Sequence, residues 1–318
     1  MAHIRPKPFT MLAALLAALA AVAAFAGQAH AARIQLGLSE QGLGVFDDVR
    51  FQKLGITHMR GFAPWNVALS ARDRDYLDAW LTAVRARGIE PLVTFTAASG
   101  SRCPARPCKL PSTAAYTRAF KAFRKRWPWV RSISPWNEAN QRSQPTFRHP
   151  KAAARFYNVV RARCHGCRIV AADVIDDPNM VRWLGVFRRY AKRPRIWGLH
   201  NYRDVNPRRH QRYGGTERLL RTVRGQVWLT ETGGIVKFVL PGGQTLFRSS
   251  ERRANLAMRR MLSLARRYRS RIRRVYVYHW RQPSGPGRFD AGLLRANGKP
   301  RPSYYTFLRA LRSPFFRS

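Results

Sequence analysis

The stretch Ser134-Pro135-Trp136-Asn137-Glu138-Ala139-Asn140 closes a short apolar run that begins at Val130. A run of this length, bounded by polar residues, is typical of a strand buried on both faces. The stretch therefore places the amide of Asn137 and the carboxylate of Glu138 where a strand ends, beside the indole of Trp136. A carboxyl group next to a flat ring that can stack on a sugar indicates a general acid acting on a carbohydrate. The alternative interpretation is that Asn137 and Glu138 only cap the next helix.

Seven further apolar runs of strand length alternate with arginine-rich segments along the chain. The eight runs cover residues 34–38, 56–60, 91–96, 130–136, 168–173, 196–200, 226–230 and 275–280. The segments between and after them place apolar residues at steps of three and four, as an outer helix does; they cover residues 73–87, 113–127, 150–164, 178–192, 216–224, 248–269 and 303–311. This alternation predicts a parallel sheet covered by helices, and eight units favour closure into a (β/α)8 TIM barrel, an α/β fold.

An open, doubly wound sheet is the competing arrangement. Such a sheet would carry a glycine-rich phosphate-binding turn after its first strand. The sequence there is Gln41-Gly42-Leu43-Gly44, which lacks the third glycine of that pattern. The barrel is therefore the fold that we expect.

Residues 1–31 have the pattern of a secretory signal peptide. Arg5 and Lys7 form a basic start, residues 11–25 are almost entirely apolar, and Ala29-His30-Ala31 supplies small residues at the cleavage positions. We expect cleavage after Ala31, a secreted protein, and one catalytic domain over residues 32–318 with no membrane span. A membrane anchor is the alternative, but the apolar run is short for a span of about 20 residues.

The chain is strongly basic, with 59 lysines and arginines against 16 acidic residues and a formal net charge of +43. Nucleic-acid binding therefore has to be considered. The basic residues are spread over the expected helices and loops, however, and no nucleic-acid-binding module accompanies them. We expect a basic shell on a monomer, with charge-driven association with anionic cell-envelope polymers and no specific nucleic-acid partner.

The four cysteines occur as two close pairs. In an exported chain, an even number of closely spaced cysteines indicates disulfides, here Cys103–Cys108 and Cys164–Cys167. A zinc site is the alternative for the second pair, because two intervening residues are also a metal-ligand spacing and His165 lies between the two cysteines.

Polar side chains that can carry chemistry stand at the ends of the expected strands, which is where TIM barrels place their active sites. Two of them are glutamates, Glu138 after the fourth strand and Glu231 after the seventh. Glu231 is followed by Gly233 and Gly234, which permit a tight turn of the backbone behind the acid. The remaining ends carry Glu40, Arg60, Thr96, Asp173, His200, Tyr202 and Trp280. In a chain with so few acidic residues, two glutamates in this setting predict a catalytic pair.

With these motifs in order, the chain resembles the clan A glycoside hydrolases, a group of retaining (β/α)8 enzymes that includes cellulase, β-xylosidase and β-1,3-glucanase families. Trp136-Asn137-Glu138 is similar to the strand-four motif of that clan, and Thr230-Glu231-Thr232-Gly233 is similar to the strand-seven motif. The resemblance implies that Glu138 is the acid/base, that Glu231 is the nucleophile and that Asn137 binds a sugar hydroxyl. Two departures stand out: Ala139 follows Glu138 where many members have proline, and the third strand ends without the His or Asp of some members.

The resemblance also implies roles in substrate binding for other strand-end residues. His200-Asn201-Tyr202 resembles the strand-six motif, whose tyrosine bonds to the nucleophile, and Arg60 resembles the arginine that keeps the nucleophile ionised. Trp280 matches the aromatic floor beneath the reacting sugar, with a cis peptide expected after it. Trp65 is a further candidate sugar platform, although packing in the core is an equal alternative.

A retaining mechanism requires Glu231 to be ionised for attack on the anomeric carbon and Glu138 to begin protonated, then to act as base toward water. This chemistry needs no cofactor, and no cluster of metal ligands stands out in the sequence. The sequence therefore predicts a retaining β-glycosidase acting on an oligo- or polysaccharide. The alternative is a non-catalytic barrel that binds polysaccharide or another anionic polymer of the cell envelope.

Overall fold

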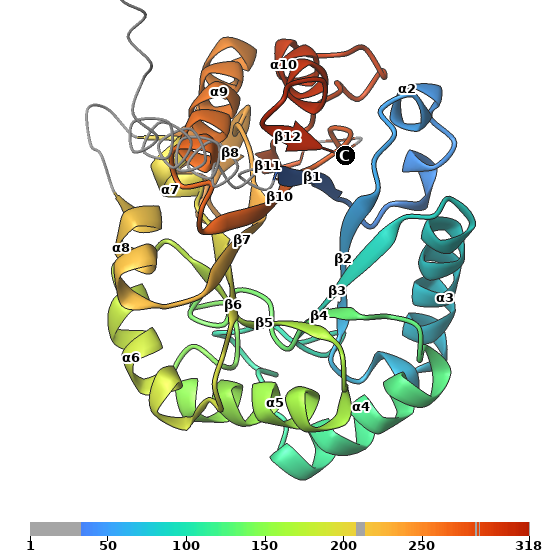
Figure 1. Ribbon diagram of the computed structural model, residues 1–318, viewed down its shortest axis with the longest axis vertical. Helices are drawn as coiled ribbons and strands as arrows, with labels where there is room; N and C mark the ends of the chain where they lie inside the picture. Colours follow the sequence, from blue (N-terminus) through green and yellow to red (C-terminus); the bar gives the residue numbers. More distant parts are fainter. Residues whose placement is uncertain (1–32, 208–213, 284, 286, 318) are drawn as a thin grey trace, which may run out of the picture.

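A computed structural model describes residues 33–207, 214–283, 285 and 287–317. The expected signal peptide lies outside these residues. Eight parallel strands form a ring in the centre of the molecule, and helices surround it (Figure 1). The strands are β1 (Ile34–Ser39), β2 (His58–Pro64), β3 (Glu90–Thr96), β4 (Ser132–Ser134), β5 (Arg168–Ile175), β6 (Ile196–His200), β7 (Gln226–Thr232) and β10 (Ile272–Tyr278).

The sheet closes on itself. Each strand pairs with the next in chain order, and β10 also pairs in parallel with β1 through the register Leu36 to Val275. The predicted (β/α)8 barrel is therefore confirmed, and the open doubly wound sheet is excluded. All eight expected strands are present, with ends that shift by a few residues.

The outer helices are α3 (Ala71–Ala86), α4 (Thr113–Arg126), α5 (Pro150–Arg163), α6 (Met180–Tyr190), α8 (Gly215–Thr222), α9 (Glu251–Arg267) and α10 (Pro302–Leu311). Serine hydroxyls cap the first turns of three of them, because Ser70, Ser112 and Ser250 each accept a bond from the backbone N–H three residues on. The short helices α2 (Val49–Gln52) and α7 (Tyr202–Val205) lie in loops after strands.

Apolar side chains fill the layer between strands and helices, and a smaller group fills the barrel itself. The outer layer is rich in aromatic rings such as Trp80, Phe120 and Phe156, all at most 1% exposed. A separate buried cluster consists of Leu92, Val170, Trp228 and Tyr276, from four of the strands. Polar side chains replace these apolar ones toward the carboxyl ends of the strands, where the candidate site begins.

Several short elements had no signal in the sequence. Strands β8 (Lys237–Val239), β9 (Thr245–Phe247) and β11 (Phe289–Asp290) form a small antiparallel sheet in the loops after β7 and β10, and β12 (Phe316–Arg317) pairs with the start of β1. Two or three residues are too few to show the alternation of a strand. No helix in the described part of the chain is long and apolar enough to span a membrane.

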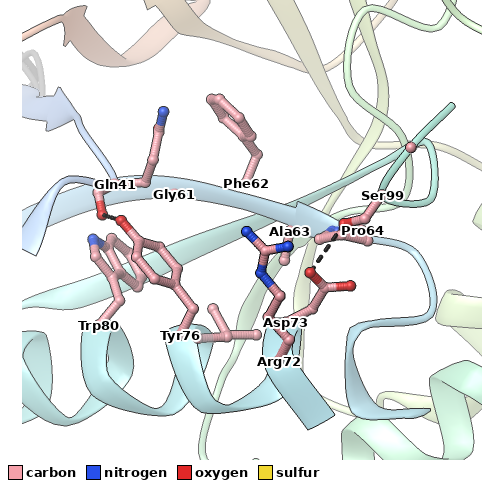
Figure 2. Close-up of a pocket in the computed structure, with 12 residues that line it drawn as sticks. Gln41, Gly61, Phe62, Ala63, Pro64, Arg72, Asp73, Tyr76, Trp80 and Ser99 are labelled. Atoms are coloured by element: carbon pink, nitrogen blue, oxygen red, sulfur yellow. Dashed lines mark hydrogen bonds between the residues drawn. The ribbon is translucent and has the colours of Figure 1, made fainter. Parts of the chain in front are cut away.

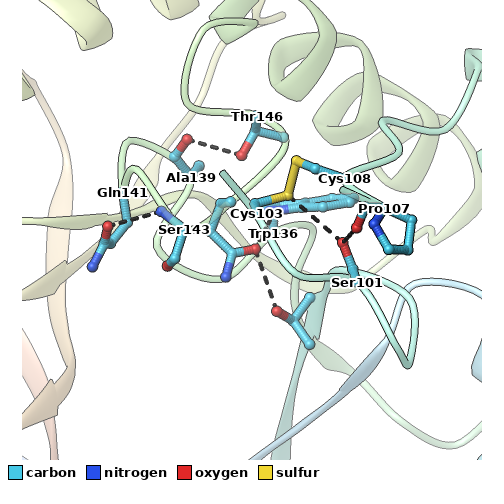
Figure 3. The surroundings of a disulfide bond; sticks show 11 residues. Ser101, Cys103, Pro107, Cys108, Trp136, Ala139, Gln141, Ser143 and Thr146 are labelled. Carbon is cyan, nitrogen blue, oxygen red and sulfur yellow. Dashed lines mark hydrogen bonds between the residues drawn. A yellow bond between two sulfur atoms is a disulfide. The ribbon is translucent and has the colours of Figure 1, made fainter. Parts of the chain in front are cut away.

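Both expected disulfides are formed. Cys103 is bonded to Cys108 and Cys164 to Cys167, so the second pair is not a zinc site. The Cys103–Cys108 loop follows β3 and lies beside the loop that follows β4, including Trp136 and Gln141 (Figure 3). The first disulfide therefore borders the segment that carries Glu138.

Candidate active site

Neighbouring strands hold the backbone around Glu138. The N–H of Asn137 donates to the carbonyl of Phe95 on β3 (2.6 Å), and the N–H of Ala139 donates to the carbonyl of Asp173 on β5 (2.9 Å). Glu138, between them, has φ of 45°, a left-handed conformation that is uncommon for a residue with a side chain. The next helix, α5, begins only at Pro150, so the helix-cap interpretation of Glu138 is excluded.

The carboxylates of Glu138 and Glu231 meet across the imidazole of His200. One ligand-capable atom from each of these three side chains lies within 4.8 Å of the other two. His200 Nδ1 is 3.1 Å from Glu138 Oε1 and 3.9 Å from Glu231 Oε2. The side chain of His200 is fully buried, whereas those of Glu138 and Glu231 are 24% and 12% exposed. The two glutamates thus face one accessible point at the carboxyl end of the barrel.

Arg60 ties Glu231 to the strand-four segment. Its side chain is fully buried; one terminal nitrogen donates to Glu231 Oε2 (2.8 Å) and the other to Asn137 Oδ1 (2.5 Å). Further bonds run to the hydroxyls of Ser39 and Thr94. Arg60 lies in the middle of β2 rather than at its end, because β2 continues to Pro64. From there its guanidinium reaches up to the strand ends.

Asp173 forms the base of this charge cluster. Its carboxylate is 3.3 Å from His200 Nε2 and 3.4 Å from the Arg60 guanidinium, and it accepts a bond from the Thr230 hydroxyl. Burial disfavours the charged form of Asp173, but His200 and Arg60 outweigh this effect and lower its pKa to about 2. Burial likewise disfavours charged His200, but Glu231 and Asp173 raise its pKa to about 10. Near neutral pH, His200 is therefore a cation enclosed by carboxylates.

Two tyrosines lie near Glu231. The Tyr202 hydroxyl donates to Glu231 Oε1 (3.2 Å), as the resemblance implied, although Tyr202 begins α7 and is not part of β6. Tyr278 ends β10, and burial together with the negative charges of Glu231 and Glu40 raises its pKa. The rings of Tyr202 and Tyr278 both pack against Phe289. Tyr278 was not among the predicted site residues, because the apolar run in the sequence continues to Trp280.

The position of Trp280 corrects that expectation. Its ring is 2% exposed and packs edge-on against Phe51 and Tyr304, while its indole N–H donates to Asp48 (3.2 Å). Because β10 ends two residues earlier than expected, Trp280 turns into the core and offers no open face to a sugar. The expected cis peptide after Trp280 is also wrong: the non-proline cis bond joins Tyr278 to His279.

Trp136 is likewise closed to a ligand. Its ring is 2% exposed and stacks on Phe156 at 5.4 Å, and its N–H donates to Gln144 (3.1 Å). Proline precedes it, and the chain reverses into the β4 loop so that the indole points back into the helical layer. Trp65 is only partly buried and stacks on Tyr116 at 6.2 Å. Of the three tryptophans expected to bind sugar, only Trp65 retains some exposure.

His200 and the two glutamates beside it also form a donor set for a metal ion, which the sequence did not indicate. Glu138, His200 and Glu231 each offer one ligand atom. A protonated imidazole does not coordinate a metal, because a ligand histidine must be neutral. Because Glu231 and Asp173 raise the pKa of His200 to about 10, a metal ion would have to displace this proton to bind all three side chains near neutral pH.

A pocket of about 620 Å³ lies beside this site, between β2 and α3. Figure 2 shows Tyr76 and Trp80 on the α3 side of β2 and Phe62 projecting to the other side of the strand. Trp80 fits closely over Gly61, where an added Cβ would lie 3.0 Å from the indole. Ser99 donates to Asp73 at the far end of the pocket (2.9 Å). Neither Glu138 nor Glu231 lines it, so this pocket is separate from the glutamate pair.

Comparisons with known proteins bear on the fold. No protein-family profile matches the chain, and no curated protein matches its sequence. Among solved structures, the β-glucosidase 1317 matches with a TM-score of 0.57 and 17% identity, covering 85% of this chain and 87% of that one. A β-xylosidase of Caulobacter crescentus matches with a TM-score of 0.58 and 13% identity, covering 87% and 67%.

Gas2p of Saccharomyces cerevisiae, solved in complex with laminaripentaose, gives a TM-score of 0.58 at 12% identity. The match covers 89% of this chain and 65% of the Gas2p chain, so this chain spans just under two thirds of that protein. At such identities the likeness shows the fold alone. It confirms that the barrel expected from the clan A resemblance is the one found in these carbohydrate-active proteins.

Proposed function

We propose that this protein is an exported glycoside hydrolase that cleaves β-linked oligo- or polysaccharides with retention of configuration. The observation that carries the proposal is the meeting of Glu138 and Glu231, from the ends of β4 and β7, within 4.8 Å across His200. Retaining enzymes hold their two carboxyl groups about 5–5.5 Å apart, whereas inverting enzymes need about 6.5–9.5 Å to admit a water molecule. The short separation therefore favours a double displacement.

The contacts of the two glutamates favour different roles for them. Glu231 accepts bonds from the Arg60 guanidinium and the Tyr202 hydroxyl, which stabilise a carboxylate ready to attack the anomeric carbon. Glu138 has His200 as its polar neighbour and is the more exposed of the two. It is therefore the group that reaches the glycosidic oxygen, first donating a proton and then taking one from water.

A charge count fits this division of roles. Arg60 and His200 are cations, and Asp173 and Glu231 are anions in contact with them. With Glu138 protonated, the five groups are neutral in sum. Transfer of the proton to the leaving group places a new negative charge on Glu138 at the moment when Glu231 loses its charge to the covalent bond. The net charge of the five groups therefore stays at zero through the first step of the reaction.

Substitution of the nucleophile tests the proposal. We expect Glu231→Gln to lower kcat by at least about 10³-fold on a β-linked glycan identified from a panel of glucan, xylan, mannan and galactan, because the amide cannot form the glycosyl ester. NMR of the first product released by the wild type should show the β anomer. Full activity in Glu231→Gln, or an α-anomeric product, would refute the mechanism.

The rival function is a non-catalytic barrel that binds polysaccharide. In that case the wild type would bind a glycan from the same panel without releasing reducing ends. The Glu231→Gln variant would bind that glycan equally well. Export, the second part of the proposal, rests on the signal-peptide pattern of residues 1–31 and on the two disulfides. Recovery of the mature chain beginning at Ala32 from the medium or cell envelope checks it.

A further inference from the structure

Arginines are concentrated at the end of the barrel opposite to the glutamate pair. Strands and helices run in opposite directions in this fold, so strand starts and helix ends share one face, which we call the N-terminal face. Each of the helices α3, α4, α5, α6, α8, α9 and α10 carries an arginine in its last turn. Six of the eight barrel strands begin at, or within two residues after, an arginine: Arg33, Arg131, Arg168, Arg195, Arg224 and Arg271.

Carboxylates are almost absent from this face. All 16 acidic residues fall within the described part of the chain. All but Asp75, Asp78 and Glu90 lie near the carboxyl ends of strands, in the loops that follow them, or in the first turns of helices, and Asp75 lies in the second turn of α3 beside Arg74. Asp78 is paired with Arg126, and Glu90 with Arg274 and Arg168. The N-terminal face therefore has an excess of exposed guanidinium groups, whereas the opposite face carries both signs of charge.

Two simpler causes do not account for this separation. Cations at helix ends stabilise the helix dipole, which explains the arginines in last turns but not those that precede strands. A general excess of arginine in the composition would add cations to both faces, but it would not remove carboxylates from one of them. Neither stabilisation of helix ends nor the arginine-rich composition therefore explains why the two faces differ in charge.

A shallow cavity of about 380 Å³ on this face indicates the chemistry of the partner. It lies along the second half of α3 and the end of α4 and is lined by Asp78, Leu81, Thr82, Arg85, Ala86, Trp127 and Trp129. The Asp78 carboxylate in this lining already accepts bonds from Arg126 and from the Trp127 N–H. The guanidinium of Arg85 lies 5.1 Å from the centre of the Trp129 ring. An indole beside a guanidinium suits a sugar ring that carries a carboxylate, because the ring stacks and the carboxylate forms paired hydrogen bonds.

We propose that the N-terminal face is a docking surface for an acidic polysaccharide. A repeating polyanion would contact several strand-start arginines at once, and the candidate active site would face away from it, open to a different glycan. The surface itself does not depend on the proposed hydrolase activity, and the choice of a polysaccharide as partner rests on the proposed export. Loss of docking and loss of hydrolysis are measured separately.

The test compares two variants of equal charge. In one, Arg33, Arg163, Arg195 and Arg224 on the N-terminal face are changed to Gln; in the other, Arg148, Arg182, Arg252 and Arg288 in loops and helix starts on the opposite side are changed to Gln. All eight side chains are exposed, so both proteins should fold, which thermal melting checks. Binding of the full chain to immobilised polygalacturonate is measured from low to physiological salt.

We expect the first variant to bind at least about tenfold more weakly than wild type at low salt, and with a shallower salt dependence, while the second stays within about twofold. Equal weakening of both variants would overturn the docking surface, because charge would then act without regard to position. No binding by the wild type would also overturn it. Tighter binding to duplex DNA than to polygalacturonate, with the same dependence on the four arginines, would overturn the choice of partner.

Discussion

Two buried arginines occupy opposite ends of the same barrel, and the groups around them differ in sign. Near the carboxyl ends of the strands, Arg60 and His200 are surrounded by three carboxylates, Glu138, Asp173 and Glu231. Near the amino ends, Arg274 shares a single carboxylate, Glu90, with Arg168 and His58. At the first end three carboxyl groups lie against two basic side chains, and the sum is neutral when Glu138 is protonated. At the second end the basic side chains outnumber the single carboxylate.

Because of this difference, the groups at the carboxyl ends of the strands can transfer protons, whereas those at the amino ends only stabilise the fold. Burial disfavours the ionised form of Glu90. Hydrogen bonds from His58, Arg274 and Ser132 outweigh this effect and lower its pKa, so the carboxylate stays ionised and bonded to these side chains. Arg274 is further covered by the Trp228 ring at 4.2 Å. At the carboxyl ends of the strands, Glu138 has His200 as its polar side-chain neighbour and is partly exposed to solvent. That exposed side is where we place the chemistry.

The largest effect that sharpens the comparison is expected from Glu138→Gln. For a sugar leaving group, which needs a proton, kcat/KM should fall by about 10³-fold. For a dinitrophenyl β-glycoside of the same sugar, which leaves without a proton, it should fall by about tenfold or less. Steady-state kinetics on the two substrates measure both values. An equal loss on both would show that Glu138 binds or orients the substrate and is not the proton donor.

The glutamate pair could be predicted from the sequence because the fold could. Each barrel strand is an apolar run buried on both faces, so counting runs assigned Glu138 to the fourth strand and Glu231 to the seventh. The side chains that connect them were harder to place. Arg60 lies in mid-strand and reaches the strand ends only through the length of its own side chain, which a count of strand ends does not reveal.

The aromatic residues were predicted less well. The run at residues 275–280 contains Tyr276, Tyr278 and Trp280 at alternating positions, and the sequence alone does not say where the strand stops. The structure ends it at Tyr278, and Trp280 then turns toward Asp48 and the core. The rule that indoles near an active site stack on sugars failed at Trp136 for a similar reason, since its neighbours in α5 offer a better apolar surface.

At the amino end, Glu90→Gln should separate stability from activity. The change leaves Arg274 without a carboxylate in a setting where only 7% of its side chain is exposed. Breaking a buried ion pair costs about 3–5 kcal/mol, and the partial exposure of Glu90 reduces the expected loss to about 2–3 kcal/mol in the free energy of unfolding. Urea unfolding measures this loss, and kcat of the folded variant should be unchanged within about twofold. A large fall in kcat with no loss of stability would contradict the distinction between the two ends.

The smallest expected effect concerns pH and His200. Its pKa is raised from about 6.5 in the unfolded chain to about 10 in the fold, so its ion pairs contribute their full stability below pH 6.5 and lose it as the pH rises toward 10. The excess stability of the wild type over His200→Gln should therefore shrink between pH 7 and pH 9 by about 2 kcal/mol, because the loss approaches about 1.4 kcal/mol per pH unit in this range. His279→Gln is the matched control: burial lowers the pKa of His279 to about 4, so this histidine is already neutral throughout that range and its contribution should not change with pH. Thermal or urea unfolding of the three proteins at several pH values measures the difference. If the difference for His200→Gln is flat, His200 is neutral in the fold, and the carboxylates at this end of the barrel are balanced by Arg60 alone.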